Sequence, residues 1–216
     1  MIIMLNFFSM DGLPYKIATV IYNLMALSFL WFLFSIPIFT IGASTTALFY
    51  VVGKIVRGEN YELYKGFWRS FRLNFKQASI IWLIIVFIGY LLITNIFGVR
   101  ALSMGKFFLY MQYILLVELL ITLIYIFPIL SRYHMTVFNS FKMAIYIGNR
   151  HLLTSFLCMM VFPGIYYILA WKSLTIIFLA AVYAFWITYL IRRKLELYAE
   201  KEEKGEKVEK KEKKEV

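Results

Sequence analysis

Acidic residues, cysteine and histidine are all scarce in this 216-residue sequence, and each scarcity argues against a class of function. Asp11 is the only aspartate, which argues against hydrolysis by paired carboxylates. Cys158 is the only cysteine, so an internal disulfide is excluded, and it has no recognisable nucleophile context. His134 and His151 have no carboxylate or cysteine at metal-ligand spacing around them, and no glycine-rich phosphate motif is present. We therefore expect no enzymatic activity, no metal and no cofactor.

Charge of either sign is also limited, whereas hydrophobic residues are in large excess. Only 16% of the residues are charged, 62% are hydrophobic and 19% are aromatic. A soluble domain is about 45–50% apolar and about 25% charged. One soluble core of this size cannot bury such a surplus. The composition therefore predicts an all-α fold: a polytopic bundle of transmembrane helices embedded in a lipid bilayer.

Five segments are long and apolar enough to cross a bilayer, since a crossing helix needs about 20 predominantly apolar residues. They are residues 17–37, 78–98, 107–130, 152–170 and 173–191. The segment 39–53 is shorter and rich in Gly, Ser and Thr, so we do not expect it to cross. Residues 1–194 thus form a membrane domain. Residues 195–216, with seven Lys and eight Glu, are expected to form a charged, largely disordered tail.

Basic residues are distributed unevenly between the two sides of this predicted bundle. The loops 54–76 and 131–151 and the segment 192–194 carry 12 Lys and Arg, against four on the opposite side. Positive charge favours the cytoplasmic side of short loops, so the C-terminus is expected to be cytoplasmic. With five crossings the N-terminus lies outside, and it moves inside if 39–53 also crosses. This distribution indicates membrane topology, so no nucleic-acid partner is expected.

The segment 64–76 is predicted to be an amphipathic helix with a basic stripe beside an aromatic stripe. Its basic residues recur every three or four positions, and they are Lys65, Arg69, Arg72 and Lys76. Its aromatic residues include Phe67, Trp68, Phe71 and Phe75. This pattern is typical of a helix in the membrane interface. Such a helix either anchors the loop to anionic lipid or docks a cytoplasmic partner. A similar but weaker amphipathic piece occupies residues 136–151.

Glu118 is the only acidic residue inside a predicted span. Helical spacing places Thr122, Tyr125 and Arg132 on roughly the same face, which predicts a polar track from mid-membrane to the inner surface. An ionisable residue at this depth is costly and faces the bundle interior or a watery cavity. Two interpretations stay open: a substrate or proton site, and a paired glutamate that fixes helix packing.

Two stretches of the sequence resemble a known family. In the first, Asn23 and Trp31 precede the run SIPIFTIGASTTALFY at 35–50, which contains Pro37, Thr40, Gly42 and Ser44. The second stretch is FWRSFRLNFKQA at 67–78. Both are similar to the YesL-like family of bacterial integral membrane proteins, a domain of unknown function. The resemblance implies a bacterial plasma-membrane location and an association with carbohydrate utilisation, and it supplies no catalytic residues.

Two functional hypotheses follow. The first is a non-enzymatic accessory protein that assists a carbohydrate uptake system by binding a sugar-transporter or sensor membrane complex. The alternative is a small proton-coupled or passive permease that uses the Glu118 track. Five spans are few for a monomeric transporter, so the alternative also requires a homo-oligomer.

Overall fold

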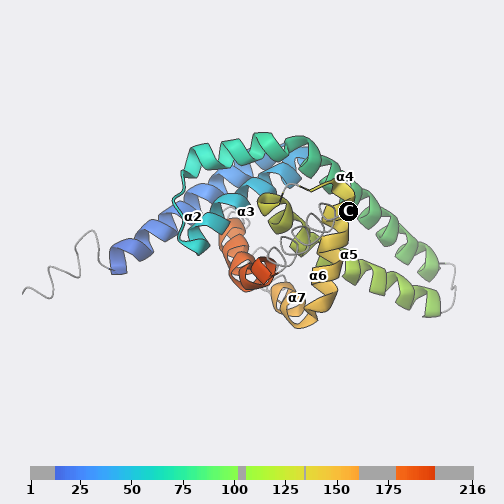
Figure 1. The fold of residues 1–216 in the computed structure, drawn as a ribbon. Coiled ribbons are helices and arrows are strands. Elements are labelled where there is room, and N and C mark those ends of the chain that lie inside the picture. Colours follow the sequence, from blue (N-terminus) through green and yellow to red (C-terminus); the bar gives the residue numbers. More distant parts are fainter. Residues whose placement is uncertain (1–12, 102–105, 134, 161–178, 198–216) are drawn as a thin grey trace, which may run out of the picture.

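The computed structural model describes residues 13–101, 106–133, 135–160 and 179–197 (Figure 1). Every regular element in these residues is a helix, which confirms the prediction of an all-α fold. In chain order they are α2 (Leu13–Ser35), the short 3-10 helix η1 (Ile38–Thr40), α3 (Ile41–Arg57), α4 (Leu63–Ala101), α5 (Lys106–Arg132), α6 (Val137–Arg150), α7 (Leu152–Met159) and a last helix at 179–197.

Four helical stretches in the described residues are long and apolar enough to cross a membrane. They are Tyr15–Ser35, Ile38–Arg57, Leu63–Arg100 and Lys106–Arg132. Three of them contain the predicted spans 17–37, 78–98 and 107–130 in whole or nearly so. The predicted spans 152–170 and 173–191 fall partly outside the described residues, as does most of the tail predicted at 195–216.

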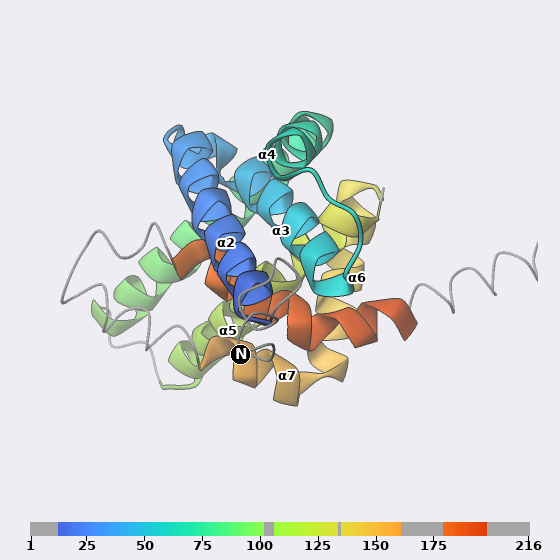
Figure 2. The same ribbon diagram turned by 90° about the vertical axis from the view of Figure 1, so that its left-hand side faces the viewer.

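The stretch Ile38–Arg57 is the one that differs from the sequence expectation, since no crossing was expected at 39–53. Its helix α3 is packed between α2, α4 and α5 (Figures 1 and 2). Ten of its residues are buried, among them Ser44 and Thr46. A helix enclosed by other helices has little contact with lipid. Small polar residues are therefore compatible with a helix at this position in the bundle.

The helices α2 and α3 form an antiparallel hairpin that turns at Pro37. Proline lacks an amide donor and disfavours a helical residue before it, so α2 ends just before this position. Near the turn, the Trp31 indole N–H donates to the Thr45 hydroxyl at 3.0 Å. Far from the turn, the Asn23 amide donates to the Tyr61 hydroxyl at 2.6 Å. The first half of α2 therefore lies beside the end of α3.

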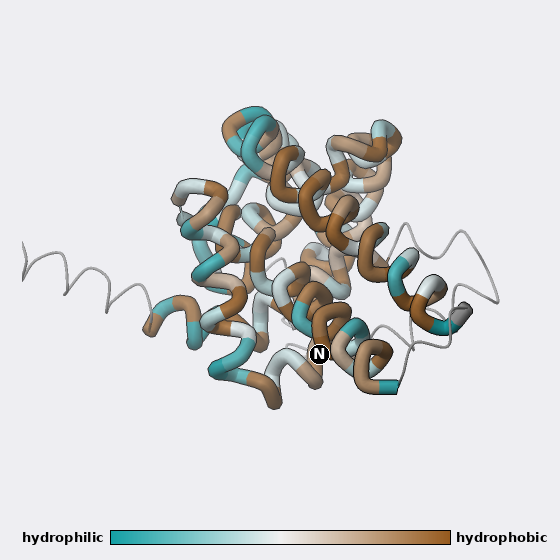
Figure 3. Tube along the Cα trace, turned by 90° about the vertical axis from the view of Figure 1, so that its right-hand side faces the viewer, coloured by the Kyte–Doolittle hydropathy of each residue, from teal (hydrophilic) through white to brown (hydrophobic). Residues whose placement is uncertain are grey.

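The basic and aromatic segment 64–76 is the first part of α4 and is continuous with the predicted span 78–98. The α4 helix has 39 residues, which corresponds to about 58 Å, and no proline interrupts it. Its first half packs along α3, as the approach of Gly42 to Ala78 shows, and its second half pairs with the first half of α5, where Arg100 donates to Tyr113. That second pair reaches beyond the rest of the described helices in Figure 1, and Figure 3 shows that hydrophobic residues predominate along it.

Candidate functional site

Residues that carry the family resemblance build the turn between α2 and α3. The Pro37 carbonyl accepts the Thr40 amide at 2.9 Å. The Thr40 hydroxyl lies 2.6 Å from the carbonyl oxygens of both Phe34 and Pro37, and so it ties the end of α2 to the turn. Two residues later, Gly42 lets α3 approach α4, because a Cβ at this position would lie 2.3 Å from the Ala78 carbonyl oxygen. In this structure these three motif residues have structural roles.

The remaining motif residues belong to the same hairpin. Asn23 and Trp31 make the two hydrogen bonds that join α2 to Tyr61 and to α3. Ser44 is fully buried, and its hydroxyl has no hydrogen-bond partner among the described residues. The motif thus describes how the hairpin packs, and it brings no group of reactive side chains together.

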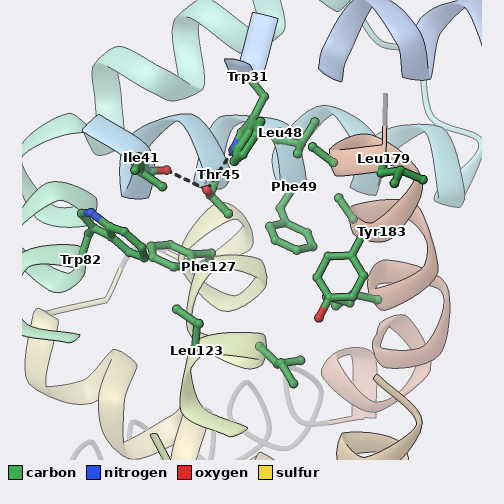
Figure 4. A pocket seen from close by; sticks show the side chains of 14 residues that line it. Trp31, Ile41, Thr45, Leu48, Phe49, Trp82, Leu123, Phe127, Leu179 and Tyr183 are labelled. Carbon is green, nitrogen blue, oxygen red and sulfur yellow. Dashed lines mark hydrogen bonds between the residues drawn. The ribbon is translucent and has the colours of Figure 1, made fainter. Parts of the chain in front are cut away.

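An apolar cavity of about 260 Å³ lies where α2, α3, α4, α5 and the last helix meet (Figure 4). Aromatic side chains line much of it, namely Trp31, Phe49, Trp82, Phe127 and Tyr183. Both indole N–H groups already donate within the protein, Trp31 to Thr45 and Trp82 to the Ile38 carbonyl at 2.9 Å. No charged residue lines the cavity within the described part of the chain. Its chemistry suits an apolar group better than a sugar or an ion.

Glu118 does not line this cavity in the described structure. Its carboxylate accepts a hydrogen bond from the Asn149 amide of α6 at 2.7 Å. Its backbone carbonyl accepts the Thr122 hydroxyl at 2.9 Å, so this threonine is satisfied within its own helix. The contact with Asn149 joins α5 to α6 and agrees with the packing interpretation of Glu118.

The other two residues of the predicted polar track have separate partners. Tyr125 is fully buried, and its hydroxyl accepts the Ser155 hydroxyl of α7 at 3.0 Å. The Arg132 guanidinium lies 3.8 Å from the Glu196 carboxylate of the last helix. Within the described part of the chain, no hydrogen bond or ion pair joins the four side chains to one another. The structure therefore places the four track residues on one helix, α5, and three of them have separate partners on other elements.

The structure separates the two stripes of the segment 64–76. Phe67 and Phe71 are 1% and 8% exposed, and their rings pack on Phe34 of α2 with centroids 5.7 and 5.1 Å away. Trp68 and Phe75 remain partly exposed, at 47% and 38%. We call the four basic residues, all of them exposed, the basic face of α4: Lys65, Arg69, Arg72 and Lys76.

Of the four basic residues of this face, only Lys65 has an ion-pair partner among the described residues. Lys65 lies 3.5 Å from Glu62, and both side chains are largely exposed. Arg69, Arg72 and Lys76 form no hydrogen bond or ion pair with any residue that the structure describes. Three neighbouring cations on one helix are thus available to a partner.

Sequence reasoning missed a cluster of arginines where the ends of α3, α5 and the last helix meet. Arg57, Arg132 and Arg192 line one small hollow of about 20 Å³. Arg57 forms two bonds with the Glu59 carboxylate, at 2.5 and 3.1 Å. Arg192 donates to the Val56 carbonyl at 3.1 Å. The sequence did contain a signal for this cluster, namely the concentration of Lys and Arg in 54–76, 131–151 and 192–194. Each of these three segments contributes one arginine to the hollow.

We expect the Glu59 contact to make stability depend on pH in acid. The hydrogen bond from Arg57, with the charges of Arg57, Lys54 and Arg132, lowers the Glu59 pKa below its usual 4.5, although partial burial opposes the shift. A carboxyl group whose pKa is lowered by folding adds to the free energy of unfolding above about pH 4.5. This stabilisation is lost as the pH falls through the pKa of the folded state. The side chain is 47% exposed, so the contribution should stay below about 1 kcal/mol. The measurement is the Tm difference between the wild type and Glu59→Gln as a function of pH. The difference should be constant near neutrality and shrink in acid; growth in acid would contradict this explanation.

Comparison with known proteins adds one match. None of the curated proteins and none of the solved structures matches the chain. A family model described as "Protein of unknown function, DUF624" matches residues 24–96, which run from the middle of α2 through α3 into the second half of α4. The match covers the basic face and the hairpin motif from Trp31 onward, and it begins one residue after Asn23. In this region the chain is similar to a family of proteins of unknown function.

Proposed function

We propose that this protein is a non-enzymatic accessory component of a bacterial carbohydrate uptake system, and that it docks onto a membrane subunit or sensor of that system through the basic face of α4. The association with carbohydrate comes from the resemblance to the YesL-like family. The mode of action comes from the surface of α4. The observation that carries the proposal is the row of unpaired, exposed cations at Arg69, Arg72 and Lys76.

Two properties of α4 make this row a suitable docking element. First, Phe67 and Phe71 hold the opposite side of the same helix turns in the core, so the cations are presented on a fixed scaffold. A preorganised surface loses less conformational entropy when it binds. Second, the row lies beside apolar helices of a membrane protein, and charged side chains are costly against acyl chains. The basic face must therefore meet water, lipid headgroups or an acidic partner.

An acidic partner accounts for the mixture of exposed residues on this side of α4. Trp68 and Leu73 are 47% and 65% exposed among the cations, and aromatic residues and arginine are enriched in protein interfaces. The partner surface would carry carboxylates opposite Arg69, Arg72 and Lys76, with an apolar contact for Trp68. The excess of positive charge near this end of the bundle favours the cytoplasmic side for this surface and for the C-terminus.

We expect charge reversal on the outer part of the basic face to abolish docking. The test is crosslinking and co-purification of the full chain from native membranes of cells grown on polysaccharide, comparing the wild type with Arg72→Glu/Lys76→Glu. Removing one partner of a buried, hydrogen-bonded charge pair costs about 2–5 kcal/mol, so recovery of the transport subunit should fall at least about tenfold.

The matched control is Lys142→Glu/Arg150→Glu, which makes the same change in net charge on exposed residues of α6. Recovery should be unaffected in this control. Equal recovery in the wild type and Arg72→Glu/Lys76→Glu, or an equal loss in both double variants, would rule out docking through the basic face.

A further inference from the structure

A second, distinct feature lies where α3 ends and α4 begins. A hollow of about 450 Å³ opens between these helices and the loop that joins them, and we call it the α3–α4 pocket. Its lining residues used below are Tyr50, Lys54, Tyr61, Lys65, Gly66 and Arg69. Figure 2 looks toward this end of the molecule, almost along the axis of α4, with the joining loop in view. The volume falls within the range of about 300–1,000 Å³ that is usual for small-ligand sites.

The charges around the α3–α4 pocket favour an anion. Lys54, Lys65 and Arg69 come from two helices, and Glu62 is the one carboxylate among the lining residues that the structure describes. Glu62 lies 3.5 Å from Lys65, and no carboxylate of the described residues lies within ion-pair distance of Lys54 or Arg69. The pocket therefore has a local excess of about two positive charges, one of them on an arginine able to bind phosphate oxygens in pairs.

The wall of the pocket is held in place by contacts within the protein. The Lys54 ammonium lies 5.1 Å from the centre of the Tyr50 ring, which keeps this half-buried side chain against α3. The Tyr61 hydroxyl is fixed by the Asn23 amide at 2.6 Å. Gly66 also lines the pocket, and a Cβ at this position would make ordinary contacts with the side chains of Val51 and Tyr50, at 3.6 and 3.9 Å.

We infer that the α3–α4 pocket binds a phosphate-bearing anion, through Lys54, Lys65 and Arg69. The same chemistry is offered by the headgroup of an anionic phospholipid and by a soluble phosphate ester. Neither source requires the docking partner proposed above. Arg72 and Lys76, which serve the docking test, lie outside the pocket lining, so the two proposals fail independently.

The test uses the full chain in nanodiscs and follows the rate at which an amine-reactive reagent acylates Lys54, relative to Lys142 on α6. One arm compares phosphatidylcholine with phosphatidylcholine containing phosphatidylglycerol. The other arm adds glycerol 3-phosphate to phosphatidylcholine nanodiscs. A ligand at about nine times its Kd should slow acylation of Lys54 about tenfold and leave Lys142 unchanged. Protection in the first arm identifies a lipid headgroup, and protection in the second identifies a soluble phosphate ester.

Three variants decide whether protection comes from the pocket. Arg69→Gln removes a lining cation and should abolish protection. Gly66→Leu adds a large apolar side chain to the pocket lining without a change in charge and should abolish protection as well. Arg72→Gln removes one charge a single turn further along the same helix and should leave protection intact. Absence of protection in both arms, or equal loss in Arg69→Gln and Arg72→Gln, would overturn the inference.

Discussion

Replacing Gly42 with leucine is expected to destabilise the protein by about 3 kcal/mol or more. A Cβ at this position would lie 2.3 Å from the Ala78 carbonyl oxygen and 2.7 Å from the Trp82 Cβ. Because the first of these atoms belongs to the α4 backbone, relief requires the two helices to separate. Overpacking of this kind costs about 1–3 kcal/mol and occasionally more. Each kcal/mol lowers Tm by about 2–4 °C in a protein of this size, so a fall of about 6–12 °C is expected.

The measurement is thermal unfolding in mild detergent, followed by the fluorescence of the five tryptophans. Gly98→Ala is the matched control, because Gly98 lies in α4 and a Cβ there would meet nothing within 4 Å. Alanine is the better helix former by about 1 kcal/mol, so this variant should be as stable as the wild type or slightly more so. If Gly42→Leu unfolds at the wild-type temperature, α3 and α4 are not packed as described.

Replacing Phe67 with alanine should cost about 3–5 kcal/mol, the usual range for a buried phenylalanine. This side chain is 1% exposed, and its ring packs on Phe34 of α2 and stacks on Phe71 with centroids 6.5 Å apart. Its loss removes one of the ring contacts that hold the first half of α4 against α2, while the contact between Phe71 and Phe34 remains. The same Tm assay measures the effect.

Leu73→Ala is the control for this variant, because Leu73 lies on the same helix and is 65% exposed. Substitutions at exposed positions usually change stability by less than about 0.5 kcal/mol. A similar loss of stability in both variants would mean that Phe67 has no special place in the core. If the Phe67→Ala protein is as stable as the wild type but no longer docks, Phe67 contacts the partner, as predicted from sequence, and is not a core residue.

The periodicity of the segment 64–76 predicted the two stripes but not their roles. Phe67, Trp68, Phe71 and Phe75 are equivalent in a sequence pattern, because all are large and aromatic. In the structure, Phe67 and Phe71 are buried, whereas Trp68 and Phe75 are partly exposed. Phe67 and Phe71 are buried because they pack on Phe34, which lies some thirty residues earlier in the chain. A pattern local to one helix cannot contain that information.

The helix α3 shows a limit of hydropathy as a guide to membrane segments. A lipid-exposed helix must be apolar on its outer surface, whereas an enclosed helix needs small residues that allow close approach. Gly42, Ala43 and Ser44 are buried at such an approach to neighbouring helices. Their modest hydropathy argued against a crossing at 39–53, whereas the structure has a buried helix there that begins after the turn at Pro37.

The partners of the polar-track residues could not be predicted from sequence for a related reason. Helical spacing places Glu118, Thr122, Tyr125 and Arg132 in order along α5, but spacing within one helix does not identify partners on others. Glu118 is bound by Asn149 of α6, and Arg132 faces Glu196 of the last helix. These contacts are set by how α6 and the last helix pack, which no single-helix pattern reports.

Site-specific photo-crosslinking in living cells tests the central claim, docking through the basic face, most directly. A photoreactive phenylalanine would be placed at Leu73, between Arg69, Arg72 and Lys76, and in parallel at Phe97 near the far end of α4. The two positions are equally exposed, at 65%, so a difference in products reflects their surroundings. Docking predicts that Leu73, and not Phe97, forms an adduct with a membrane component of carbohydrate transport or sensing. Adducts with lipid alone at Leu73, or the same products from both positions, would contradict it.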